Sequence, residues 1–253
     1  MNPKVNPNIL KFVDNPEVAS AFAKKFVELV EELSKTQSKI TVSLSGGSTP
    51  KLLFSVLAEQ YADKVKWDAL HLFWGDERCV APDDAESNFG EANRLLISHV
   101  PIPSANIHRV NGESEPTTEA KRYGQEITEH LDLDENGVPR FDILLLGMGS
   151  DGHTASIFPH QMELLNSNEI CEVATHPESG QKRITVTGKV LNAGKNVFFL
   201  ITGESKASVL AEIVNRNGSF ETYPTSFVKP LGENGNGKCT FYIDDQAGKF
   251  LTQ

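Results

Sequence analysis

The sequence predicts an α/β protein with a mostly parallel sheet flanked by helices. Short β-branched or apolar runs alternate along the chain with amphipathic segments of helical length. One run, FDILLLG after Pro139, is continuously apolar, which is typical of a parallel strand covered on both faces. Alternation of this kind indicates right-handed crossovers between parallel strands.

The first helix is predicted over residues 17–34, where apolar side chains recur at three-and-four spacing. Asn15 is the expected N-cap, because a proline follows it at the first helical position. The β-branched run 39–45 then leads into Gly46 and Gly47, which predicts a strand followed by a tight turn.

The same alternation continues to the end of the chain. Further helices are predicted over residues 51–59, 87–98, 117–131 and 204–215. Further strands are predicted over residues 70–74, 106–110, 182–187, 196–202 and 238–243, besides the one after Pro139. A surface loop is expected at 231–238, LGENGNGK. No shift in composition marks a boundary, so one domain is expected over residues 1–253.

Composition narrows the possible partners. The chain carries 34 acidic and 24 basic side chains, a formal net charge of −10. Nucleic acid and anionic membranes are therefore not expected partners, because both need a basic face. A single small phosphate remains possible, since a few local cations can bind it.

Cysteine usage and hydropathy indicate a cytoplasmic location. The three cysteines are odd in number and show no CxxC spacing, so neither a zinc site nor a disulfide framework is predicted. No run approaches the roughly 18 apolar residues that span a bilayer. A monomer is the expected state.

The first candidate binding loop is Ser45–Thr49, between a strand and a helix. Its glycines let backbone N–H groups approach a ligand, and Ser48 or Thr49 could cap the following helix. Exposed N–H groups at a helix start make an anion site without lysine. A capped turn that binds nothing is the open alternative, and the Walker pattern is absent.

A second candidate loop is Asp76-Glu77-Arg78, which directly follows a predicted strand. Such triplets usually neutralise one another in a solvated turn. The alternative is that Arg78 binds a phosphate while a carboxylate holds the guanidinium in place.

The most informative loop follows FDILLL and begins GMGSDGHTASIFP at Gly147. Its opening fits GxGxxG, but Pro159 leaves no room for the crossover helix that a dinucleotide site requires. It also places His153 two residues after Asp151 at a glycine-rich strand end. A carboxylate beside an imidazole favours general acid–base chemistry, although a lone histidine is more often structural.

The remaining cations and histidines carry less information. Arg183 and Lys206 stand near strand ends, and each alone is most simply a surface charge. The six other histidines have no comparable surroundings and are assigned no role: His71, His99, His108, His130, His160 and His176.

Three motifs together resemble the 6-phosphogluconolactonases. They are SLSGGSTP (43–50), LFWGDERCV (72–80) with SNFG (87–90), and LLLGMGSDGHTASIFP (144–159). The resemblance covers nearly the whole chain and implies a NagB-like, modified Rossmann fold. It implies hydrolysis of 6-phospho-D-glucono-1,5-lactone in the pentose phosphate pathway, with no metal or organic cofactor.

The resemblance also assigns the site. Catalysis is expected from His153 as general base, with Asp151 beside it. The expected substrate and phosphate contacts are Ser45, Gly46, Gly47, Ser48, Thr49, Asp76, Arg78, Asn88, Gly149, Arg183 and Lys206. One departure is Tyr223-Pro224-Thr225, where members often carry Pro-Ala-Ser.

Two other functions remain open. Glucosamine-6-phosphate deaminases share SGGSTP, but their histidine motif typically reads DGHIAFNEP, and the Asn-Glu pair is missing here. A non-catalytic sugar-phosphate module would share the anion loops but would not need Asp151 and His153.

Overall fold

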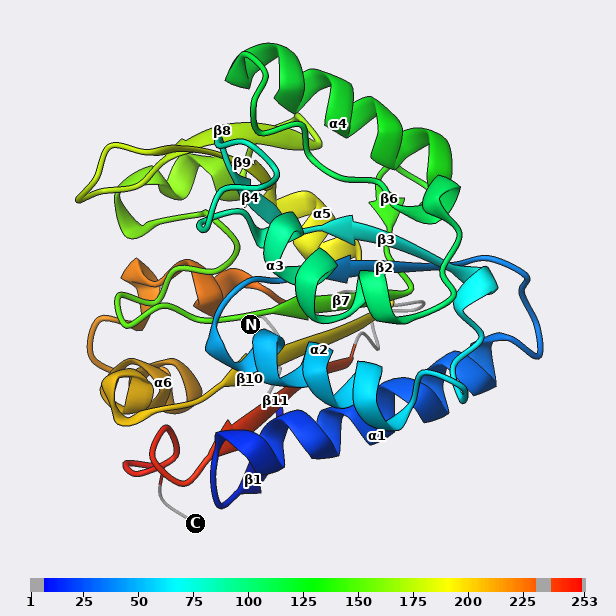
Figure 1. The fold of residues 1–253 in the computed structure, drawn as a ribbon. Coiled ribbons are helices and arrows are strands. Elements are labelled where there is room, and N and C mark those ends of the chain that lie inside the picture. Colours follow the sequence, from blue (N-terminus) through cyan, green and yellow to red (C-terminus); the bar gives the residue numbers. More distant parts are fainter. Residues whose placement is uncertain (1–6, 231–237, 252–253) are drawn as a thin grey trace.

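The computed structural model describes residues 7–230 and 238–251. Its centre is a six-stranded sheet in the order β1-β11-β10-β7-β2-β3, with every neighbouring pair parallel. The strands are β1 (Asn8–Phe12), β2 (Ile40–Leu44), β3 (Leu70–Trp74), β7 (Ile143–Leu146), β10 (Asn196–Ile201) and β11 (Lys238–Asp244). Figure 1 follows this order across the sheet, with β3 and β1 at the edges. The predicted α/β class with a mostly parallel sheet is confirmed.

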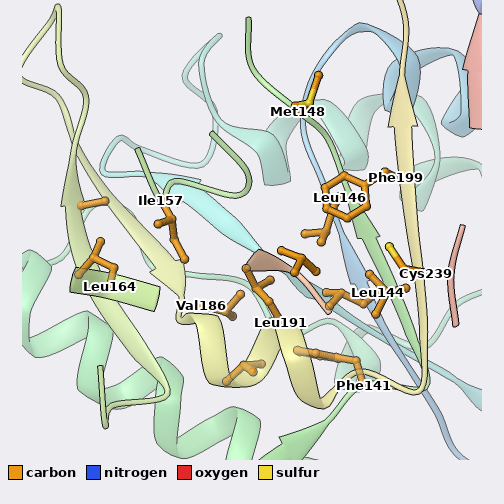
Figure 2. Close-up of a cluster of buried hydrophobic side chains, with 14 of the residues drawn as sticks. Phe141, Leu144, Leu146, Met148, Ile157, Leu164, Val186, Leu191, Phe199 and Cys239 are labelled. Atoms are coloured by element: carbon orange, nitrogen blue, oxygen red, sulfur yellow. The ribbon is translucent and has the colours of Figure 1, made fainter. Parts of the chain in front are cut away.

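Helices cover both faces of this sheet. They are α1 (Asn15–Leu33), α2 (Ser48–Gln60), α3 (Asn88–Leu95), α4 (Pro116–His130), α5 (Gly188–Ala193) and α6 (Ala207–Asn215). Leu144 and Leu146 of β7 pack in the cluster that contains α4, α5 and α6, part of which is drawn in Figure 2. Ile143 and Leu145 pack in the opposite cluster with α1 and α2. Strand β7 is therefore buried on both faces, as its apolar run predicts.

A second, antiparallel sheet lies beside the first. It consists of β4 (Asp76–Arg78), β9 (Lys182–Val186) and β8 (Cys171–Thr175), in the order β4-β9-β8. A small hairpin joins β5 (Asp132–Leu133) to β6 (Pro139–Arg140). The prediction that the Asp76–Arg78 triplet is a loop is wrong, because these residues pair with β9.

The predicted strand at 106–110 is also wrong. Residues Ser104–Asn106 form a short 3-10 helix, and Ile107 makes only a single bridge to Leu72. The chain then turns away from β3. Strand β1 was not predicted because only two of its five residues are even half-buried, so it lacks an apolar pattern.

Two caps differ from the predictions. Asp14, not Asn15, caps α1, since its Oδ1 accepts from the Glu17 N–H at 2.9 Å. Gly47 is the N-cap of α2 with φ of +110°, and no side chain caps this helix. Neither Ser48 nor Thr49 performs the predicted capping role, so the first N–H groups of α2 have no side-chain acceptor.

Two further predictions concern the loop at 231–238 and membrane-spanning segments. The loop expected at 231–238 lies, apart from residue 238, outside the described residues, and 238 begins β11. Within residues 7–230 and 238–251, no helix has the length and apolar character needed to cross a membrane.

Candidate active site

The candidate site lies where the order of the central sheet reverses. The chain passes from β2 to β3 on one side, and from β7 to β10 and β11 on the other. Loops that follow neighbouring strands diverge at such a point and leave a crevice for ligands. The two loops meet here, because a Cβ atom placed on Gly147 would lie 3.8 Å from the Ser45 hydroxyl.

His153 and Asp151 form a hydrogen-bonded pair in the loop after β7. The Nδ1 atom of His153 lies 2.6 Å from Oδ1 of Asp151, which also accepts from the His153 backbone N–H at 3.1 Å. Burial raises the pKa of Asp151, but the bonds from His153 outweigh it and hold that pKa at about 2. The carboxylate therefore stays charged and fixes the proton on Nδ1, leaving Nε2 as the base. The His153 side chain is 28% exposed, so solvent and substrate can reach it.

Glycine is required at two positions of this loop. A Cβ atom on Gly149 would lie 2.1 Å from His153 Nδ1 and 2.4 Å from Asp151 Oδ1. Gly152 has φ of +80°, and a Cβ there would lie 2.6 Å from the Tyr223 ring. Gly149 thus leaves the space that the pair occupies, which is its observed role at the site.

Sequence analysis did not find the segment that supports this loop. The backbone N–H and the hydroxyl of Thr225 both donate to the Gly152 carbonyl, at 3.1 and 2.9 Å. Thr225 is buried, and it stands in the segment where the sequence departs from the family pattern. A threonine gives no sequence signal of this role until its partner in the fold is known.

A cavity of about 250 Å³ opens beside the start of α2. Its lining includes Gly46, Gly47, Ser48, Lys51, Arg78 and Asn88. A Cβ on Gly46 would lie 2.0 Å from Asn88 Oδ1, so glycine allows these two segments to touch. The lining also includes Glu86 and Glu91, and Lys51 Nζ lies 3.3 Å from Glu91 Oε1, so the uncapped N–H groups and Arg78 are the candidate anion donors of this cavity.

Glu77 explains how Arg78 and Asn88 reach this cavity. The Glu77 side chain is only 2% exposed, and its carboxylate accepts from the backbone N–H groups of Arg78, Asn88 and Phe89. Burial raises its pKa, against the lowering effect of these bonds. Glu77 therefore anchors the start of α3, and the solvated-turn interpretation of the triplet is wrong.

Arg78 and Arg183 are opposite one another in the antiparallel pair of β4 and β9. Like charges in this arrangement are unfavourable unless an anion lies between or near them. Burial and the Arg78 charge lower the pKa of Arg183. The Arg78 Nε is buried and has no hydrogen-bond partner among the described residues, although its Nη1 donates to the Glu86 carbonyl at 2.6 Å.

Arg183 also connects this region to the catalytic loop. Its guanidinium carbon lies 5.7 Å from the centre of the Phe158 ring, which lies 4.7 Å from the centre of the His153 ring. The imidazole and the guanidinium therefore both lie near the Phe158 ring, which links β9 to the His153 loop.

The side chains of Asp76 and Thr49 form hydrogen bonds with other loops of the protein. Asp76 is buried, and its Oδ2 accepts from the Ser156 hydroxyl at 2.6 Å. The Thr49 hydroxyl lies 2.8 Å from that of Thr202, which joins α2 to the end of β10. Both residues hold loops together, and sequence analysis found neither partner.

Lys206 completes the set of cations. It is half-buried, and its ammonium makes no hydrogen bond or ion pair within residues 7–230 and 238–251. Burial lowers its pKa, while the charge of Asp151 acts in the opposite direction and places the two groups within electrostatic reach. An unpaired, half-buried ammonium near the His153 loop is available for a ligand.

The loop does not fit a dinucleotide. After Gly152 the chain makes a tight turn, closed by a bridge between Thr154 and Ile157, and continues as the 3-10 helix Pro159–Leu165. The α-helix whose first turn would face a pyrophosphate does not follow this strand.

The fold and the site define an α/β protein with an anion cavity and a His–Asp pair at a topological switch point. The chain belongs to the family described as glucosamine-6-phosphate isomerases/6-phosphogluconolactonase, whose family model matches residues 13–236. It is 43% identical to the 6-phosphogluconolactonase of Haemophilus influenzae over 245 residues, 96% of this chain and all of that one.

Solved structures agree with this assignment. The structure of 6-phosphogluconolactonase from Trypanosoma cruzi has a TM-score of 0.86 at 31% identity, covering 98% of this chain and 97% of that chain. That of the Trypanosoma brucei enzyme has a TM-score of 0.86 at 28% identity, with 97% and 99% covered. The NagB-like fold expected from the motifs is confirmed.

Proposed function

We propose that this chain hydrolyses 6-phospho-D-glucono-1,5-lactone to 6-phospho-D-gluconate, as a carboxylic ester hydrolase of the pentose phosphate pathway. The observation that carries the proposal is the pair of His153 and Asp151, with Nδ1 2.6 Å from Oδ1, on the loop after β7, together with the cavity at the start of α2 that Gly47, Ser48 and Arg78 line. Relatives at 43% identity over their full length carry the name of this enzyme, which supports the choice of substrate.

His153 is the general base of the proposed reaction. Its Nε2 takes a proton from water as the water oxygen forms a bond to C1 of the lactone. The resulting tetrahedral intermediate collapses, the bond from C1 to the ring oxygen breaks, and the imidazolium returns the proton to that oxygen. Asp151 stabilises the transient imidazolium and keeps the ring oriented, as a triad carboxylate does.

The phosphate is the handle by which the substrate is held. Uncapped N–H groups of α2 at Gly47 and Ser48 are the proposed backbone donors, and Arg78 supplies the adjacent cation. Arg183, which is paired with Arg78 across β4 and β9, and Lys206, which the Asp151 charge reaches, bind the remaining charged or hydroxyl oxygens. Binding energy from the phosphate then orients C1 toward the base.

The proposed site is built from one chain, so the reaction requires no second copy, and we propose a monomer acting as one domain. The thiols of Cys79, Cys171 and Cys239 are free, which suits a reducing cytoplasm.

The direct test is acid release from freshly prepared 6-phosphogluconolactone, followed with and without the protein. A rate well above spontaneous hydrolysis, with no ammonia released from glucosamine 6-phosphate, supports the lactonase. Ammonia release without lactone hydrolysis would contradict the lactonase and support the deaminase. Binding of 6-phosphogluconate without turnover of either substrate would indicate a sugar-phosphate module.

A further inference from the structure

Three histidines from distant parts of the chain gather at the end of the sheet opposite the candidate active site. His71 is the second residue of β3, His108 follows the 3-10 helix at 104–106, and His130 is the last residue of α4. One ring nitrogen from each lies within 4.8 Å of the others. The catalytic loops, in contrast, follow the carboxyl ends of the strands.

A carboxylate orients the central histidine of this cluster. His108 is buried, and its Nδ1 lies 2.9 Å from Oε1 of Glu126, while its Nε2 lies 2.9 Å from Nδ1 of His71. The Glu126 pKa is raised by burial but lowered overall by bonds from His108 and Arg122. An ionised Glu126 holds the proton on His108 Nδ1, so the Nε2 lone pair points into the cluster. This carboxylate–histidine pairing is the usual second layer of a metal site.

The rings are held in place by packing. Phe73 stacks on His108 with ring centres 4.3 Å apart, and His130 lies 4.2 Å from His108 on the same measure. His71 and His130 are partly exposed, which gives an ion a path from solvent. Among the described residues, a metal would replace the hydrogen bond between the rings of His71 and His108.

Lys39, whose ammonium donates to the His130 carbonyl, adds a positive charge beside the cluster and sets a limit on the affinity.

We propose that His71, His108 and His130 bind one late first-row divalent metal ion, with Zn²⁺ as the test ion. Three imidazoles suit Zn²⁺, Cu²⁺ or Ni²⁺, and they leave a fourth position for water. The set contains no oxygen ligand, so Mg²⁺ and Ca²⁺ are excluded. The bound ion would tie β3, the segment at 108 and the end of α4 together.

The test is Zn²⁺ binding to chelator-treated protein, measured by calorimetry and by the rise in Tm. One equivalent should bind to the wild type, and Mg²⁺ should give no rise. His71→Asn and His130→Asn should each weaken binding at least about 10-fold, and Glu126→Gln about 10-fold or more, as loss of a second-layer carboxylate does. His99→Asn, which changes an exposed histidine outside the cluster, should bind as the wild type does.

Two controls keep the outcome clear. The Tm of each metal-free variant shows whether it folds, and His108 is left unchanged because it is buried. His153→Asn tests whether the ion sits at the candidate active site instead. The proposal is overturned if Zn²⁺ does not bind, if binding survives in His71→Asn and His130→Asn, or if it is lost only in His153→Asn. None of these readouts uses lactone hydrolysis, so the two proposals fail separately.

Discussion

The Nδ1 atom of His153 lies 2.6 Å from Oδ1 of Asp151, a carboxylate only two residues earlier in the chain. This short loop makes the contact because Gly149 leaves the space open and Gly152 adopts φ of +80°. The pair is fixed by local geometry, whereas its support from Thr225 comes from a segment about seventy residues away.

Asp151→Asn should lower kcat at least about 10-fold, because the amide stabilises the imidazolium poorly. KM should change little, because the proposed phosphate contacts remain. The check is steady-state kinetics with freshly prepared 6-phosphogluconolactone, with Asp83→Asn, an exposed aspartate, as the matched control. A variant that folds normally and keeps a near wild-type kcat would show that Asp151 does not act on the base.

Gly149→Ala should reduce kcat by about 10² or more, because the added methyl collides with both His153 and Asp151. Gly147→Ala is the comparison, since its methyl would lie no closer than 3.8 Å to the Ser45 hydroxyl. Steady-state kinetics of the two variants, with Tm as a folding check, separate local displacement from general damage. An equal fall in kcat in both variants would contradict the claim that glycine is needed at 149 to leave space for His153 and Asp151.

Arg78→Ala and Lys206→Ala should each raise KM about 10-fold or more, which is the value of one hydrogen bond to a charged group. Their kcat values should change less, because these cations hold the substrate in the ground state and transition state alike. Lys24→Ala changes an exposed lysine on α1 and should leave both constants unaltered. A fall in kcat with unchanged KM would place these residues at the reacting atoms instead.

Glu77→Ala should destabilise the protein by about 3 kcal/mol, because three buried or part-buried N–H groups lose their shared acceptor. The expected fall in Tm is about 6–12 °C for a chain of this length. Thermal unfolding of Glu77→Ala beside Glu59→Ala, an exposed glutamate of α2, checks this. KM should rise as well, since Glu77 sets the positions of Arg78 and Asn88. A fall in Tm with an unchanged KM would show that Glu77 contributes to stability and not to substrate binding.

The sequence pattern was sufficient for five of the six strands of the central sheet, all but β1, and it placed Asp151 beside His153. Strand β7 is continuously apolar because both faces are buried, and the Asp151–His153 contact is short-range, so both are visible in a linear sequence. The Asp76–Arg78 strand could not be predicted from the linear sequence, because its buried charges are satisfied by distant groups such as Ser156 and the start of α3.

Long-range contacts account for the other omissions. Thr225, Thr202 and Glu77 act through partners whose proximity depends on the tertiary fold. The same holds for the cluster of His71, His108 and His130, which are separated by 37 and 22 positions in the numbering. Their residue types are informative only after the fold brings them together.

The central claim is that His153 is the base for lactone hydrolysis, and kinetics of His153→Ala with freshly prepared 6-phosphogluconolactone test it most directly. Loss of one positioned base should lower kcat by about 10² to 10⁴. KM should change little, because the phosphate contacts remain. A variant that folds normally and keeps a near wild-type kcat would contradict the account.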